Sequence, residues 1–220
     1  MKHSLILIPI VLLFVACGGG VRQTDKLLVE VWAKDQGVRR QMMELTKAVT
    51  TIDGREDLID SLVVVSEKLE RIDAENMAIV DTLLQQGLPE GLSAESYKTI
   101  WIVIDHAPLD RQVYYLPLVE QMATHGMIGK AEFATLYDRV AMKQNHPQRY
   151  GSQSVQFGTP ESMQLFVWPI ESPEILDSLR ASVGMGPIAD YILQLTTTTG
   201  IEAQYIPTLS VEELNKLRNN

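Results

Sequence analysis

The sequence predicts a mainly α-helical protein, an irregular helical bundle with one β-hairpin at about residues 152–168, inserted after the fifth helix. Apolar residues recur at helical spacing in five successive segments before residue 145. Two short β-prone runs follow, separated by Gly158, Thr159 and Pro160. The chain has 220 residues and one cysteine, so core burial without intrachain disulfides must stabilise it.

The first two helices are expected to be long and amphipathic. The apolar pattern runs from residue 24 to about 49, and again from 56 towards 86. Residues 50–54 break the pattern between them, and Gly87 and Pro89 end the second helix.

Three shorter helices complete the part before the hairpin. Ser93 can cap a third helix that ends at His106. Pro108 suits the first turn of a fourth helix, in which Pro117 is expected to produce a kink. A fifth helix includes residues 133–140.

Short helices are also expected after the hairpin. Residues 172–182 begin with Ser-Pro-Glu, which combines a cap, a first-turn proline and an acidic residue near the positive helix end. Residues 184–187 turn the chain into another helix that ends near Gly200. Ser210 and Glu213 have capping-box spacing for a short terminal helix.

The N-terminus is typical of an exported lipoprotein. Lys2 and His3 precede an apolar run over residues 5–14. This run is too short for a membrane-spanning helix, which needs about 20 residues. Residues 14–17, Phe-Val-Ala-Cys, resemble the bacterial lipobox, although Phe stands where leucine is usual. We therefore expect cleavage before Cys17 and lipidation of its sulfur; in the alternative, ordinary secretion, this cysteine is incidental.

The sequence accordingly predicts a signal peptide at residues 1–16, followed by a lipidated cysteine with a flexible tether at 17–23. A single helical domain with its hairpin follows at 24–199, and a C-terminal tail with a short helix at 200–220. Two or three acyl chains would make the anchoring stable. Gly18, rather than Asp, follows the cysteine. By resemblance to lipoprotein sorting in Gram-negative bacteria, this favours the outer membrane.

The charge balance limits the partners. With 19 Lys+Arg against 28 Asp+Glu, the chain has a formal net charge of −9. Nucleic acid is not expected as a ligand, because its binding depends on basic residues. The lipid, rather than the acidic protein surface, is expected to supply the membrane contact.

Five stretches resemble an uncharacterised bacterial family of unknown function, whose best marker is an Asp-Arg pair followed by Gln-Arg-Tyr-Gly-Thr-Gln. The matching residues are Asp35, Gln36 and Arg39; Asp73, Asn76, Gly87 and Pro89; His106, Leu116 and Pro117; Asp138, Arg139 and 147–153; and Arg180, Val183, Gly184, Pro187 and Tyr191. Asp105 departs from the family's Gln, and Ser152 from its Thr. The resemblance implies a shared fold and site but no known reaction.

The marker run supplies the candidate binding residues. They are Arg139, Gln148, Arg149, Tyr150, Gly151, Ser152 and Gln153. In the functional hypothesis, an arginine of this set holds a small anionic ligand, because guanidinium matches carboxylate and phosphate. In the structural alternative, Asp138 and Arg139 pin the following loop to the helix, and Gln148 and Gln153 satisfy buried backbone groups.

His106 and Asp138 are the candidate catalytic residues. A carboxylate of Asp138 or Asp105 against the imidazole would permit acid–base chemistry. The alternative is a helix-end histidine bonded to a carbonyl group. The sequence contains no metal signature, phosphate loop, nucleophile elbow or dinucleotide fingerprint, so we expect no metal and no cofactor.

Two functions remain open at this point. The first is a cell-envelope lipoprotein that binds a protein or a small anionic ligand and catalyses nothing. The second is an envelope hydrolase with His106 as general base and Arg139 as anion clamp. The first is favoured because the sequence offers no recognisable nucleophile or metal site.

Overall fold

The computed structural model describes residues 19–51, 56–159 and 162–219. Within them the protein is mainly helical, with one small sheet after the fifth helix, as the sequence predicts. The expected signal peptide and Cys17 lie outside the described residues. Among the helices that the structure describes, none is both long and apolar enough to cross a membrane.

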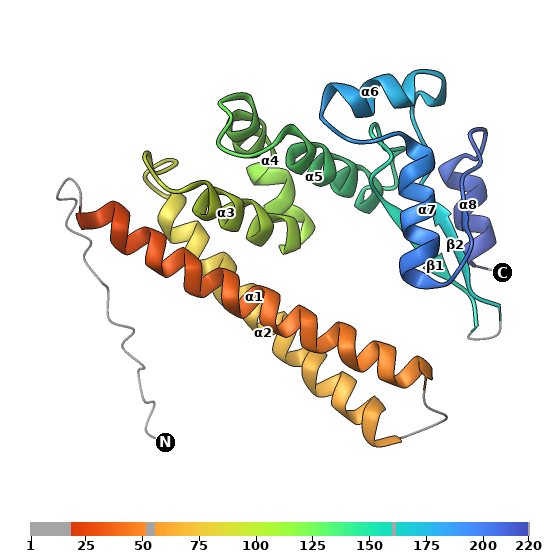
Figure 1. Ribbon diagram of the computed structural model, residues 1–220, viewed down its shortest axis with the longest axis horizontal. Helices are drawn as coiled ribbons and strands as arrows, with labels where there is room; N and C mark the ends of the chain where they lie inside the picture. Colours follow the sequence, from red (N-terminus) through yellow and green to blue (C-terminus); the bar gives the residue numbers. More distant parts are fainter. Residues whose placement is uncertain (1–18, 52–55, 160–161, 220) are drawn as a thin grey trace, which may run out of the picture.

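Helices α1 (Gly19–Thr51) and α2 (Glu56–Leu84) lie side by side as a long antiparallel hairpin (Figure 1). Helix α1 begins five residues earlier than the sequence predicts, so residues 19–23, expected to be a flexible tether, are helical. Two local interactions account for this difference. Val21 packs against the main core, and the hydroxyl of Thr24 donates to the carbonyl of Gly20 at 3.0 Å.

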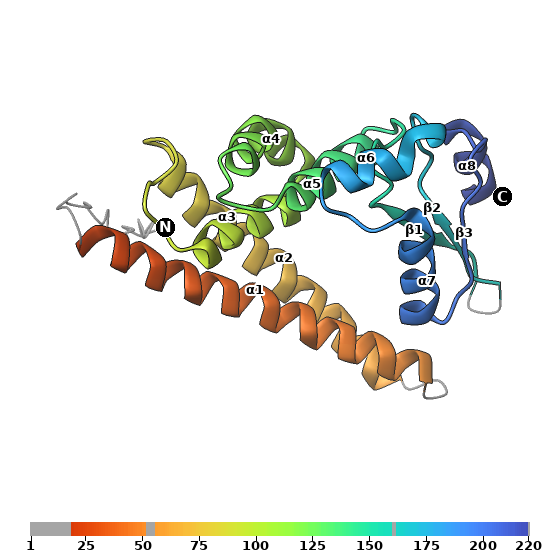
Figure 2. The same ribbon diagram turned by 45° about the horizontal axis from the view of Figure 1, so that its top comes forward.

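Helix α3 (Ala94–His106) packs on α1 and α2 of this hairpin, and α4 (Leu109–Thr124) and α5 (Lys130–Lys143) pack on α3 and on each other (Figure 2). Ser93 caps α3 as expected, because its side chain accepts from the backbone N–H of Ser96. Pro108 is the N-cap of α4 rather than a residue of its first turn, and Pro117 lies inside that helix. The shared core includes the buried side chains of Leu28, Val80, Ile100, Ile104, Val119, Met122 and Leu136.

The sheet has the strand order β1-β2-β3. Strands β1 (Ser154–Phe157) and β2 (Gln164–Val167) form the expected antiparallel hairpin. Strand β3 (Ala203–Gln204), which the sequence does not predict, pairs parallel to β2. Residues 200–219 are therefore joined to the sheet, and Leu214 is fully buried in a cluster with Phe166 and Trp168.

Four further elements surround the sheet: η1 (Pro173–Ile175), α6 (Leu176–Ser182), α7 (Ile188–Thr199) and α8 (Val211–Arg218). The first is a 3₁₀ turn, and Ser172 makes no side-chain capping bond there, contrary to the sequence expectation. The capping box at Ser210 and Glu213 is present as predicted. These elements lie at the opposite end of the molecule from the start of α1 (Figure 1).

Candidate functional site

His106 lies at the end of α3 in a polar network with α1 and α2. Its Nδ1 is 3.0 Å from Oδ1 of Asp35, a fully buried carboxylate, and its Nε2 accepts from Nε of Arg39 at 3.2 Å. Arg39 also donates to both oxygens of Asp73, at 2.9 and 3.0 Å. The NH1 group of Arg39 lies 3.2 Å from Oδ1 of Asp35. One guanidinium thus joins three helices.

These contacts define the state of the imidazole. Because Nε2 of His106 accepts a hydrogen bond from the Nε–H of Arg39, the neutral ring carries its proton on Nδ1, which donates a hydrogen bond to Asp35. A carboxylate in that position orients the ring and stabilises any imidazolium that forms, as in an acid–base pair. The nitrogen that would have to take a proton from a substrate is, however, already hydrogen-bonded.

The same network resembles a metal site in its ligand types. Asp35, Asp73 and His106 each offer one ligand atom, and these atoms lie within 4.8 Å of one another. The guanidinium of Arg39 contacts both carboxylates, so an arginine already supplies the positive charge there. The structure therefore has an internal ion-pair network at this position.

His106 is a candidate from the sequence, but its partners in this network are not. Asp35 and Arg39 have the four-residue spacing of a helical ion pair, which was available in the sequence. Nothing in the sequence indicated that Asp73 and His106 would meet them, because 34 and 67 positions separate these residues from Arg39.

Asp138, the second catalytic candidate, is fully buried on α5 and anchors the loop that follows. Its oxygens accept from the backbone N–H groups of Arg149, Tyr150 and Ser152, at 2.9 to 3.2 Å, and from the Ser152 hydroxyl at 2.9 Å. Burial raises the pKa of Asp138, while these donors, led by Tyr150, act in the opposite direction. The carboxylate contacts the loop and not His106.

Gln148 and Gln153 form a second set of internal bonds. The amide of Gln148 donates to the carbonyls of Gln153 and Trp168, at 2.9 and 2.7 Å, and its oxygen accepts from the N–H of Gln153 at 2.8 Å. Both side chains are buried. These are the contacts expected of the structural alternative, since they satisfy backbone groups between the loop and the sheet.

Arg180 and Tyr191 fix the same loop from the other side. Arg180 donates to the carbonyls of Tyr150, Gly151 and Gly186, at 2.8, 3.0 and 2.6 Å. The hydroxyl of Tyr191 donates to the carbonyl of Ser152 at 2.8 Å. Burial lowers the pKa of Arg180 and raises that of Tyr191. Neither residue was among the sequence candidates for binding, although both belong to the family resemblance.

Arg139 and Arg149 are the two arginines among the candidates, and both are at least partly exposed. Arg139 donates through Nε to Oδ1 of Asp105 at 2.9 Å, with 30% of its side chain exposed and the carboxylate buried. Arg149 is exposed and lies over the Tyr150 ring, 5.7 Å from its centroid. Burial lowers the pKa of Lys143, and the positive charge of nearby Arg139 lowers this pKa further.

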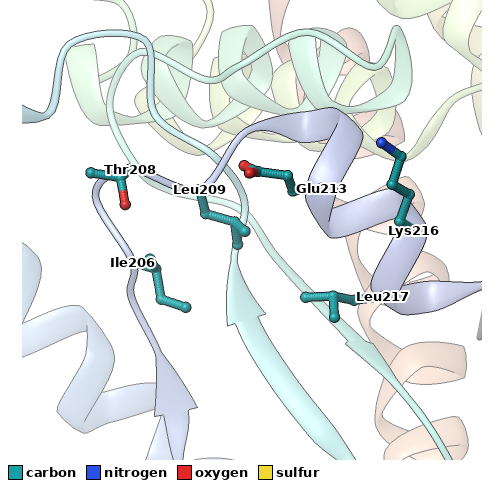
Figure 3. Close-up of a pocket in the computed structure, with 6 residues that line it drawn as sticks. All are labelled: Ile206, Thr208, Leu209, Glu213, Lys216 and Leu217. Atoms are coloured by element: carbon teal, nitrogen blue, oxygen red, sulfur yellow. The ribbon is translucent and has the colours of Figure 1, made fainter.

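Two surface cavities lie away from these candidates. One, of about 420 Å³, is lined by Ile206, Thr208, Leu209, Glu213, Lys216 and Leu217, between α8 and the segment that precedes it (Figure 3). The other, of about 480 Å³, is lined by Val29 and Trp32 of α1 and by residues 94, 95, 98 and 99 of α3. Neither contains His106 or a residue of the marker run.

Comparison with known proteins identifies a family. A family described as of unknown function, DUF6624, matches residues 23–204, which is most of the chain. Comparison with curated proteins gives no significant match. Comparison with solved structures also gives none. The chain belongs to the DUF6624 family of unknown function.

Proposed function

We propose that this protein is a lipid-anchored cell-envelope lipoprotein, acylated at Cys17, whose domain binds an anionic ligand or partner without catalysing a reaction. The support for the anchor is the short apolar run and the lipobox-like residues 14–17. Acylation with two or three chains gives stable anchoring. Gly18 favours the outer membrane of a Gram-negative cell.

The observation that carries the binding proposal is the Arg139–Asp105 pair. Asp105 is buried and holds one edge of the guanidinium through Nε, so the fork has a fixed direction while its side chain remains partly exposed. A pre-oriented guanidinium suits two-point binding of a carboxylate or phosphate. Lys143 adds a second cation beside it. An anion placed there would face the positive charges of Arg139 and Lys143, with the Asp105 carboxylate bonded to Nε of the guanidinium.

Ligand titration tests this proposal. Inorganic phosphate and succinate are titrated into wild type, Arg139→Ala and Arg139→Lys, with calorimetry and melting temperature as readouts. Wild type should bind at least one of the two anions and melt higher in its presence, and Arg139→Ala should lose both effects. Arg71→Ala is the matched control, because Arg71 is an exposed arginine on α2. Equal responses of wild type and Arg139→Ala would overturn the proposal.

Fractionation with labelled palmitate tests the anchor. Wild type should carry label in the membrane fraction. Cys17→Ala should lose the label and leave that fraction. An unlabelled wild type that is found outside the membranes would contradict the anchor and leave the anion site to the titration above.

The second candidate function, an envelope hydrolase, is favoured by the Asp35–His106 pair. One feature weighs against it, because Nε2 of His106, the nitrogen that would take a proton from a substrate, already accepts a hydrogen bond from Arg39. If the protein is a hydrolase, His106→Ala should abolish release of soluble fragments from purified peptidoglycan and leave the melting temperature nearly unchanged. A large fall in melting temperature would instead indicate a structural histidine.

A further inference from the structure

Among the described residues, the outer half of the α1–α2 hairpin has an apolar cluster that is built from these two helices. We call this half the distal hairpin and define it as residues 40–51 and 56–70. The apolar cluster nearest to it consists of α1 and α2 residues alone: Val38, Met42, Leu45, Val65, Leu69 and Ile72. By contrast, the main core also includes residues of α3, α4 and α5. Both views show the distal hairpin extending past α3 (Figures 1 and 2).

This segment exposes a second apolar face. Ile59 and Val63 are each 54% exposed, Val64 is 63% exposed, and Met43 on α1 is 66% exposed. Ile59 and Val63 are four residues apart and share one side of α2. Pairing with a single helix requires one apolar stripe, which Val65, Leu69 and Ile72 already provide. The extra face is typical of a helix with further neighbours in a bundle.

Charges on the distal hairpin favour one kind of neighbour. Residues 40–51 of α1 contain two basic residues and one acidic residue, Arg40, Lys47 and Glu44. Residues 56–70 of α2 contain five acidic residues and one basic residue. Two α2 surfaces would repel each other, whereas α1 of one chain attracts α2 of another.

We propose that the occupant is a second copy of this chain. Two distal hairpins form a four-helix bundle in which α1 of each copy packs against α2 of the other. All neighbouring helices are then antiparallel, and both copies begin at the same end of the bundle. The two-fold arrangement buries Met43, Ile59 and Val63 of both chains in one self-complementary interface.

The size of the surface sets the strength. Fifteen helical residues extend over about 20 Å, so each copy contributes less than the roughly 800 Å² per partner of a stable dimer. Interfaces of this small size are typical of transient complexes, and we expect a dissociation constant on the order of micromolar. The dimer should respond to protein concentration and be favoured wherever the chain is crowded on a surface.

Photo-crosslinking in intact cells tests the contact directly. The full chain carries p-benzoylphenylalanine in place of Val63, or in place of Leu193 on α7 as the control, which is 67% exposed. The Val63 position should give a product of twice the chain mass that yields only peptides of this protein. The control should give none. A product with a different protein, or none at all from position 63, would overturn the proposal.

Light scattering of the purified full chain in detergent gives a second readout. Wild type should change from monomer to dimer across the micromolar range, and Val63→Lys should remain monomeric. Leu193→Lys should behave as wild type. Because Val63 is exposed, its substitution should leave the melting temperature of the monomer nearly unchanged. A wild type that stays monomeric over the whole range contradicts the proposal independently of the crosslinking.

Discussion

Nε of Arg39 lies 3.2 Å from Nε2 of His106, and the same guanidinium is bonded to both oxygens of Asp73. Removing this side chain leaves the buried carboxylate of Asp35 without its nearest cation. Arg39→Ala should therefore lower the free energy of unfolding by about 2–3 kcal/mol. Urea denaturation at neutral pH measures the change.

The control for that prediction is Arg71→Ala. Arg71 pairs with Glu75 on the same exposed face of α2, with 64% and 51% of the side chains accessible. Exposed pairs of this kind change stability by about 0.5 kcal/mol or less. A similar loss in both variants would show that the Arg39 network adds nothing beyond surface charge.

Asp138→Asn should be among the most destabilising single-atom changes in the protein. The carboxylate accepts from three backbone N–H groups and a hydroxyl, and an amide group would direct its own donor at some of them. The expected loss is about 2–4 kcal/mol in urea unfolding. Asp177→Asn is the matched control, because exposed Asp177 accepts only from the N–H of Ile188 among the described bonds. Its loss should be below about 1 kcal/mol.

Gly151→Ala should cost more than Gly184→Ala. Both glycines have positive φ angles, 67° and 80°, so each substitution carries a backbone penalty of about 1–2 kcal/mol. A Cβ at position 151 would also lie 3.2 Å from Cδ1 of Ile188 and 3.3 Å from Cδ1 of Ile170, whereas position 184 is open. Thermal unfolding should show an additional loss of about 1–2 kcal/mol for Gly151→Ala. Equal losses would mean that the neighbours move aside.

Tyr115 gives a pH-dependent prediction. Burial, with the hydrogen bond to Asp81 at 2.7 Å, raises its pKa to about 12. In the unfolded chain the phenol of Tyr115 ionises near pH 10, so the native state binds the phenolic proton more tightly than the unfolded state does. Stability from this group is complete below about pH 10 and is lost as the pH rises towards about 12. The difference in unfolding free energy between wild type and Tyr115→Phe, measured from pH 9 to 11, should decrease. A constant difference would contradict the raised pKa.

Local signals in the sequence predict much of the fold. Ser93 and the Ser210–Glu213 pair act within one helical turn, and both form the expected caps. The β1–β2 hairpin is equally local. By contrast, the parallel pairing of Ala203 with Leu165 joins residues almost forty positions apart. Strand β3 has only two residues, which is too short for an alternating pattern to predict it.

The polar networks divide in the same way. The marker run was recognisable because Asp138 and the residues that donate hydrogen bonds to it, in the segment 149–152, lie close together in the sequence. The sequence did not reveal which side chains of the marker run are buried and which are exposed. The partners of His106 come from two other helices. Arg39 and Asp73 can meet it only in one register of the α1–α2 hairpin, and no local sequence pattern specifies that register.

Helix α1 continues for 33 residues without a break, which corresponds to a rod of about 50 Å. A force applied at its first turn acts along this rod and shears it against α2, so that many contacts share the load. A force applied through the last helix instead acts on the Leu214 contact and on the two-residue strand β3 at the sheet edge. We therefore expect the molecule to resist pulling more strongly at its beginning than at its end.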